Sequence, residues 1–128
     1  MLRKRALLIC IGAVVLCAAG IALAAAVKVT LEPFPAGSPI EPGASGQAVL
    51  NYAKGADKTE VQVNCKGLKP DSDYVVYLKT GGTFDLIGKF ITNSKGNGHL
   101  HASLAGDRSA DLPVAVNNRA GATVLLSP

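Results

Sequence analysis

The sequence predicts an all-β chain: an antiparallel β-sandwich of about seven strands that follows an N-terminal signal peptide. Two observations carry this prediction. Short segments in which apolar and polar residues alternate recur between turn residues along the chain. After residue 26, no segment repeats apolar residues at the helical period of 3.6 over a helix-sized length. The same pattern is also typical of a small β-barrel, which stays open as an alternative.

The first 26 residues have the organisation of a secretory signal peptide. A basic start at residues 3–5 precedes an uncharged run of apolar and small residues at 6–27. Small residues close this run, so we expect cleavage after Ala26, with Ala24 as the alternative site. Residues 27–128 would then form one secreted or periplasmic domain. An uncleaved membrane anchor is the competing interpretation, because about 20 apolar residues can span a bilayer as a helix.

Cysteine usage agrees with one domain that is held together by packing. Cys10 and Cys17 lie in the signal, and the bulky residues before them, Ile9 and Leu16, disfavour a lipid anchor at either position. Only Cys65 remains after processing, and one cysteine cannot form an internal disulfide. A chain of about 100 residues can bury enough surface to form a core without disulfides.

Charge argues against a nucleic-acid partner. The 128 residues carry 13 basic and nine acidic side chains, but three of the basic ones leave with the signal. The exported domain therefore has a net charge of +1, with no cluster of Lys and Arg for nucleic acid or anionic lipid. A membrane contact is expected only if the N-terminal segment is not cleaved.

Three strands are expected in the first half of the exported domain. Residues 27–31 and 47–53 alternate with a period of two, and the proline-rich stretch 32–46 between them predicts an extended crossing. The clearest strand is 60–66, where polar residues alternate with Val61, Val63 and Cys65. This pattern indicates an antiparallel sheet with one wet face and places Cys65 in the core.

A hairpin is expected next. Residues 74–80 alternate, and Gly81–Gly82 suits a tight turn because glycine adopts positive φ without strain. The returning strand, 83–92, loses its alternation at Leu86–Ile87 beside Gly88, which predicts a β-bulge.

The remaining sequence alternates short strands with polar turns. A turn at 93–98 leads to a strand at 99–104, and a polar loop then leads to a strand at 112–116. Residues 117–121 turn the chain into a final strand at 123–126.

One stretch resembles a known family. Residues 67–76, with the sequence GLKPDSDYVV, resemble the Leu-x-Pro-x-x-x-Tyr-x-Val stretch of fibronectin type III and related immunoglobulin-like domains. The resemblance implies an immunoglobulin-like β-sandwich with a tyrosine corner, in which the Tyr74 ring lies in the core near Leu68. It also implies that the Tyr74 hydroxyl bonds to backbone a few residues upstream. Together with the FxTNxxGxG pattern of residues 90–98, the stretch is similar to small secreted bacterial modules, which implies export and non-catalytic use.

The two histidines are the sharpest chemical hint. His99 and His101 are two residues apart on a predicted strand, so both project from one face, about 7 Å apart. Leu100 and Ala102 take the core face, which places both imidazoles on the wet face, where they could bind copper or zinc. Tight sites use three or four ligands, so two solvated histidines are the simpler interpretation.

Catalysis is not expected. The serines show no nucleophile motif, and the only possible bases are the two histidines. Cys65 should be buried, where a thiol has a raised pKa and stays inert. We therefore expect a non-enzymatic protein without a cofactor.

Two surfaces are candidates for binding. Asn117, Asn118 and Arg119 form a predicted tip at one end of the sandwich, where such folds commonly place recognition loops. Outward apolar residues of the central hairpin form a second candidate, unless other elements cover them. These residues are Val75, Tyr77, Ile87 and Ile91.

The function predicted from the sequence is that of an exported, non-catalytic β-sandwich module. It would bind an unidentified protein, glycan or envelope component, or serve as a structural subunit, outside the cell or at the cell envelope. The alternative is a periplasmic copper- or zinc-binding protein that uses His99 and His101.

Overall fold

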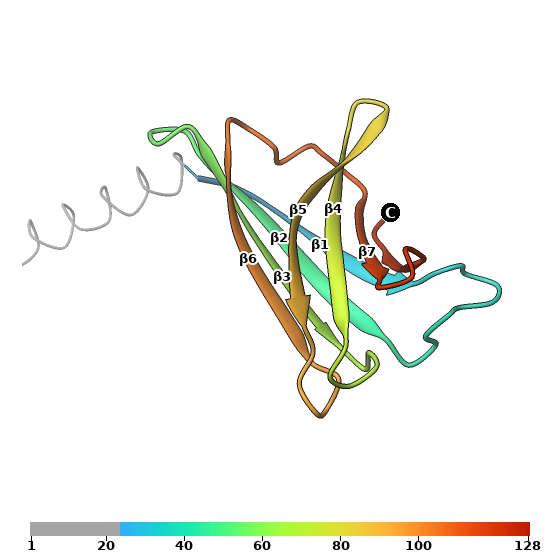
Figure 1. Ribbon diagram of the computed structural model, residues 1–128. Coiled ribbons are helices and arrows are strands. Elements are labelled where there is room, and N and C mark those ends of the chain that lie inside the picture. Colours follow the sequence, from blue (N-terminus) through green and yellow to red (C-terminus); the bar gives the residue numbers. More distant parts are fainter. Residues whose placement is uncertain (1–23) are drawn as a thin grey trace, which may run out of the picture.

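The computed structural model describes residues 24–128, which fold into antiparallel β-structure (Figure 1). The eight strands are β1 (Ala24–Pro33), β2 (Ser45–Ala53), β3 (Lys58–Lys66), β4 (Asp73–Thr80), β5 (Thr83–Ile91), β6 (Gly98–Ala105), β7 (Val114–Asn118) and β8 (Thr123–Leu126). Residues 24–128 contain no helix, and hence none of the length and apolarity that crossing a membrane requires. The predicted signal lies outside the described residues, apart from its last three, which belong to β1.

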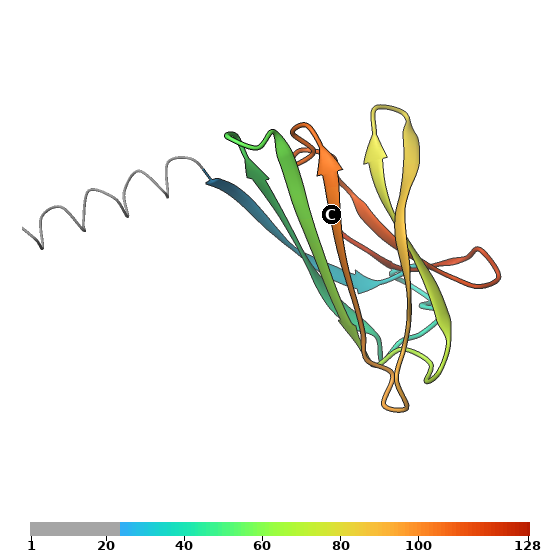
Figure 2. The same cartoon turned by 60° about the vertical axis from the view of Figure 1, so that its left-hand side comes forward.

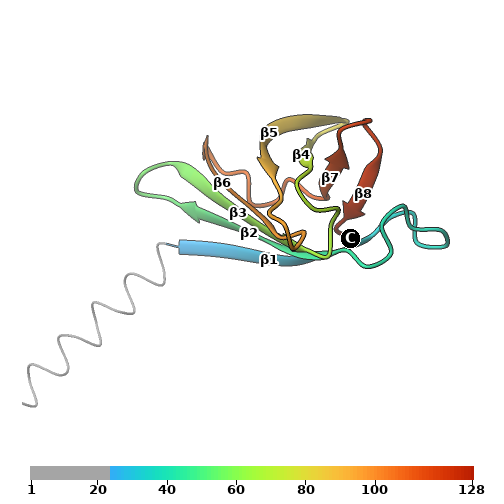
Figure 3. The ribbon, with the colours of Figure 1, turned by 60° about the horizontal axis from the view of Figure 1, so that its bottom comes forward.

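The strands form one sheet in the order β5-β4-β7-β8-β1-β2-β3-β6. The sheet curls until its two edge strands, β5 and β6, approach each other, so the shape is nearly that of a barrel (Figure 3). The all-β, antiparallel prediction is confirmed, whereas the expected sandwich of about seven strands becomes eight strands in one continuous sheet.

The long strand β1 makes the sheet continuous. Its residues 24–31 pair with β2, and the last two, Glu32 and Pro33, pair with β8. β1 therefore joins one half of the sheet (β1, β2, β3 and β6) to the other (β5, β4, β7 and β8). A sandwich with two separate sheets would lack this hydrogen-bonded connection.

The strands form where the apolar period of two predicts them. In β3, Val61, Val63 and Cys65 are at most 5% exposed and alternate with exposed or half-buried polar residues. The same alternation in β4 buries Tyr74, Val76 and Leu78. These side chains meet others from β2, β7 and β8 in a single core.

The predicted bulge is present in β5. The pairing of β4 with β5 shifts between Val76, opposite Gly88, and Tyr77, opposite Leu86. Ile87 therefore has no direct partner on β4 and turns inward, where it packs against the core.

The two ends of the sheet differ. At one end lie the β2–β3 turn and Ala24, which pairs with Ala53 beside that turn. At the opposite end of β3, the chain enters the loop at residues 67–72, which leads to Tyr74.

Candidate functional site

The region beside Tyr74 is built as a tyrosine corner. Tyr74 is 1% exposed, and its ring stacks on that of Phe90 with 5.6 Å between the centroids. The backbone N–H of Lys69, five residues upstream, donates to the Tyr74 hydroxyl at 3.1 Å. This is the upstream backbone contact that the resemblance implied, and Leu68 lies in the same core.

Glu41 completes this corner, although no pattern in the sequence predicts its role. The Tyr74 hydroxyl donates to the Glu41 carboxylate, whose two oxygens lie 2.8 and 2.9 Å away. The N–H of Lys69 donates to the same carboxylate at 2.9 Å. Burial, followed by the hydrogen bond to Glu41, raises the pKa of Tyr74 to about 12. The hydroxyl is therefore a neutral donor at physiological pH.

The loop at residues 67–72 is held on both sides. The Thr92 hydroxyl donates to the Lys69 carbonyl at 2.6 Å and accepts from the Ser72 N–H at 2.9 Å. Gly67 adopts a φ of 71°, and a Cβ there would lie 2.1 Å from the Gly43 carbonyl oxygen, so only glycine allows this approach. The backbone of this loop is therefore held in place, while its outer side chains point towards solvent.

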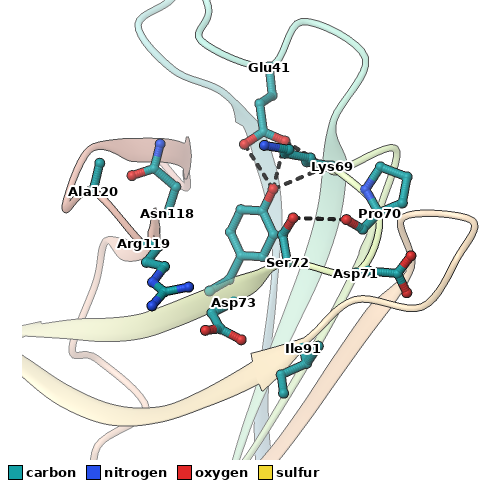
Figure 4. Close-up of a pocket in the computed structure, with 11 residues that line it drawn as sticks. Glu41, Lys69, Pro70, Asp71, Ser72, Asp73, Ile91, Asn118, Arg119 and Ala120 are labelled. Atoms are coloured by element: carbon teal, nitrogen blue, oxygen red, sulfur yellow. Dashed lines mark hydrogen bonds between the residues drawn. The ribbon is translucent and has the colours of Figure 1, made fainter.

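A depression of about 700 Å³ opens beside this corner (Figure 4). We call it the corner depression. In Figure 4, Glu41 and Lys69 lie on one side, and Asn118 at the end of β7 lies on another, with Arg119 and Ala120 of the following turn. Its lining residues are Glu41, Lys69, Pro70, Asp71, Ser72, Asp73, Tyr74, Ile91, Asn118, Arg119 and Ala120.

The rim of the corner depression carries unused charge. Lys69, Asp71, Asp73 and Arg119 are all exposed, and within residues 24–128 none of their charged groups takes part in an ion pair or hydrogen bond. Two carboxylates and two cations are thus available to a ligand at little cost in lost internal contacts.

The structure divides the predicted tip. Asn118 and Arg119 line the corner depression, whereas Asn117 does not. The Asn118 side chain accepts from the Ala122 N–H at 2.9 Å, and that of Asn117 accepts from the Thr123 hydroxyl at 2.8 Å. Both amides therefore serve the turn itself, and Arg119 is the residue of the three that remains free to bind.

The histidines project from the wet face of β6, as expected, and lie outside the corner depression. His99 Nδ1 lies 2.6 Å from the Asn64 side-chain oxygen, and His101 Nε2 lies 2.7 Å from Glu60. In the part of the chain that the structure describes, no group of three His, Cys, Asp or Glu residues is placed to hold a metal ion. Metal binding by the pair stays a prediction.

Glu60 stands between two potential reactive groups. Its carboxylate accepts from the Ser103 hydroxyl at 2.6 Å and contacts His101, and these hydrogen bonds, that from Ser103 first, lower the Glu60 pKa. A Ser–His–acid relay needs the imidazole between the hydroxyl and the acid, so this order cannot activate the serine.

Cys65 is 5% exposed, and burial raises its pKa to about 12. The thiol is therefore protonated at neutral pH, which makes it a poor nucleophile.

The predicted apolar patch differs in one residue. Ile91 is 70% exposed, and Val75 and Tyr77 are half-buried. Ile87 was expected to face outward, which is wrong, because the bulge turns it inward and exposes Leu86, at 63%, instead.

No protein-family model matches the chain, and no curated protein matches it.

Proposed function

We propose that this chain is an exported, non-catalytic binding module that recognises a polypeptide partner through the corner depression. One observation carries the proposal: four charged side chains, unpaired among the described residues, surround a base that the hydrogen bonds of Tyr74, Glu41 and Thr92 hold in place. A pre-organised base lowers the entropy that is lost when a ligand binds.

The mixture of charges indicates the class of partner. Asp71 and Asp73 would repel a uniformly anionic ligand such as nucleic acid, and Lys69 and Arg119 would repel a uniformly cationic one. A polypeptide surface offers both signs at short range. Exposed Ile91 adds an apolar contact at the edge of the same depression.

The place of the corner depression suits an exported protein. It lies at the end of β3 opposite to the β2–β3 turn, whereas β1 begins beside that turn at Ala24. In the alternative of an uncleaved N-terminal anchor, the domain would present the corner depression away from the membrane. The signal-like N-terminus supports a secreted or periplasmic location for the processed chain.

Two further points belong to the proposal. The Tyr74 corner supports an immunoglobulin-like origin of the fold, although the curled sheet is more barrel-like than that of such sandwiches. Two observations support a role without catalysis. Cys65 is protonated at neutral pH, and the Ser103 hydroxyl donates to Glu60 rather than to His101.

A site-specific crosslink tests the proposal. A benzophenone amino acid is introduced at Ala120, which lines the corner depression, and at Ala56, which is exposed in the β2–β3 turn at the other end. Illumination of the cells that make the protein should give a discrete polypeptide adduct from Ala120 and none from Ala56. Adding Asp73→Lys and Arg119→Glu should abolish the adduct.

Two results would contradict the proposal. Equal adducts from both positions, or none from Ala120, would show that the corner depression is not a binding site. An adduct whose mass is that of a saccharide would keep the site and overturn the polypeptide class.

A further inference from the structure

The two edges of the sheet lie next to each other without pairing. β5 and β6 follow one another in the chain, yet within residues 24–128 each is hydrogen-bonded to only one neighbouring strand, β4 and β3 respectively. Figures 1 and 2 show the two strands close together near their connecting turn and farther apart towards their other ends. We call the space between them the seam.

Side chains close the seam near the turn. A Cβ on Gly98 would lie 2.1 Å from the Phe90 ring, and one on Gly88 would lie 2.8 Å from a Leu100 methyl group. Phe90 and Leu100 therefore reach across the seam over a bare backbone on the opposite strand, which holds the two backbones apart.

The edge of β5 is protected against pairing with another strand. The bulge at Ile87 interrupts its regular backbone. Asp85 pairs with the buried Leu78, so it lies on the inner face, where it forms an ion pair with Arg108 at 3.1 Å. Bulges and inward-pointing charges are the devices by which edge strands avoid edge-to-edge association.

The edge of β6 has none of these devices. From Gly98 to Ala105 it contains no Lys, Arg, Asp, Glu or Pro, and its pairing with β3 continues without a bulge. Its inward residues Leu100, Ala102 and Leu104 remain only half-buried. Away from the turn, beyond the part that Phe90 and Leu100 close, the seam therefore leaves both backbone hydrogen-bonding groups and apolar surface beside β6.

The sequence of β6 is self-complementary. In the order Leu100-His101-Ala102-Ser103-Leu104, a two-fold axis at Ala102 would place Leu100 opposite Leu104 of a second copy. Ala102 would face its own equivalent, and His101 would face Ser103 of the second copy. Apolar side chains thus meet apolar ones on the inner face, and no like charges meet on the outer face.

We propose that a second copy of this chain docks on the edge of β6, with the two β6 strands pairing antiparallel about Ala102. The pairing extends the half of the sheet that contains β1, β2, β3 and β6 across a symmetric dimer. Two-fold dimers with self-complementary interfaces are the commonest oligomers, and edge-strand addition supplies the backbone hydrogen bonds. No residue of β6 lines the corner depression, so this inference is independent of the proposed function.

A disulfide at the two-fold axis tests the register. Ala102→Cys brings two equivalent thiols face to face and should give a disulfide-linked dimer under mild oxidation. The matched control is Ala105→Cys on the same strand. The two Ala105 positions would lie six residues apart along the strand, about 20 Å, beyond the roughly 7 Å reach of a disulfide. The wild-type chain corrects for Cys65, which is buried and protonated.

Sedimentation equilibrium of the exported protein supplies a second readout. The wild type should show a monomer–dimer equilibrium. Ala102→Lys, which places a charge at the axis, should raise the dimer dissociation constant about tenfold or more. Gln62→Lys puts the same charge at an exposed position of β3, one strand in from the edge. It should leave the dimer dissociation constant nearly unchanged. A wild type that stays monomeric to its solubility limit, or equal crosslinking at positions 102 and 105, would overturn the proposal.

Discussion

Replacing Tyr74 with Phe removes one hydroxyl from the tyrosine corner and leaves the ring in the core. The lost bond is one to a carboxylate, and hydrogen bonds to charged groups contribute about 1.5–3 kcal/mol. Two features reduce this figure. Glu41 is half-buried, so water can replace the hydroxyl as its donor, and the Lys69 N–H keeps Glu41 as an acceptor. We expect the free energy of unfolding to fall by about 1–2 kcal/mol.

Urea unfolding at constant pH measures this loss, with Tyr77→Phe as the matched control. Tyr77 is half-buried, and its hydroxyl has no hydrogen-bond partner among residues 24–128, so its loss should cost much less. A double-mutant cycle that adds Glu41→Ala should show coupling between positions 41 and 74, because both members of one hydrogen bond are removed. Equal midpoints for Tyr74→Phe and Tyr77→Phe, or purely additive effects in the cycle, would refute this reasoning.

The pH dependence provides an independent check. The folded state raises the Tyr74 pKa from 10.0 to about 12, so the unfolded chain releases this proton at lower pH than the folded chain. The contribution of Tyr74 to stability is complete below pH 10 and is lost as the pH rises towards about 12. Tyr74→Phe lacks this titration, so the difference in stability between wild type and variant should narrow over that range.

Three further predictions concern other parts of the chain. Cys65 should react with a thiol reagent only in denaturant, because it is 5% exposed and its pKa is about 12; rapid labelling of the native protein would contradict this. N-terminal sequencing of the exported protein should find Val27 first, whereas a start at Met1 in a membrane fraction would indicate an anchor. His99→Ala with His101→Ala should change the free energy of unfolding by less than about 0.5 kcal/mol, because both side chains are exposed. A copper or zinc titration should then find weak binding to the wild type at most; a tight stoichiometric complex that the double variant lacks would support a metal carrier.

The strands could be predicted because their signal is local. Alternation within residues 60–66 is enough to bury Cys65, whatever the strand pairs with. The break in alternation at Leu86–Ile87 beside Gly88 likewise predicts the bulge from neighbouring residues alone. The prediction for Ile87 is wrong, however, because Ile87 is itself the inserted residue: it turns inward, and the alternation resumes with Leu86 facing outward.

Contacts between distant residues could not be predicted in this way. Glu41 lies in a proline-rich crossing and reaches Tyr74 over 33 positions, and no periodicity in either segment indicates that meeting. The curling of the sheet could not be predicted either, because it depends on contacts between distant segments: β1 changes partners from β2 to β8 at Glu32. The turn that contains Arg119 could be predicted from neighbouring residues, but the depression that Arg119 lines depends on the loop at residues 67–72.

The change of partners in β1 also imposes an order on folding during synthesis. Residues 32 and 33 can meet Leu125 and Leu126 only after nearly all of the described chain has emerged. The β1–β2–β3 meander can form early, because its strands are neighbours in the sequence, but the two halves of the sheet stay unjoined until β8 arrives. A chain that crosses a membrane with its N-terminus leading would thus remain open enough to thread, and would close only when its C-terminal strand has crossed.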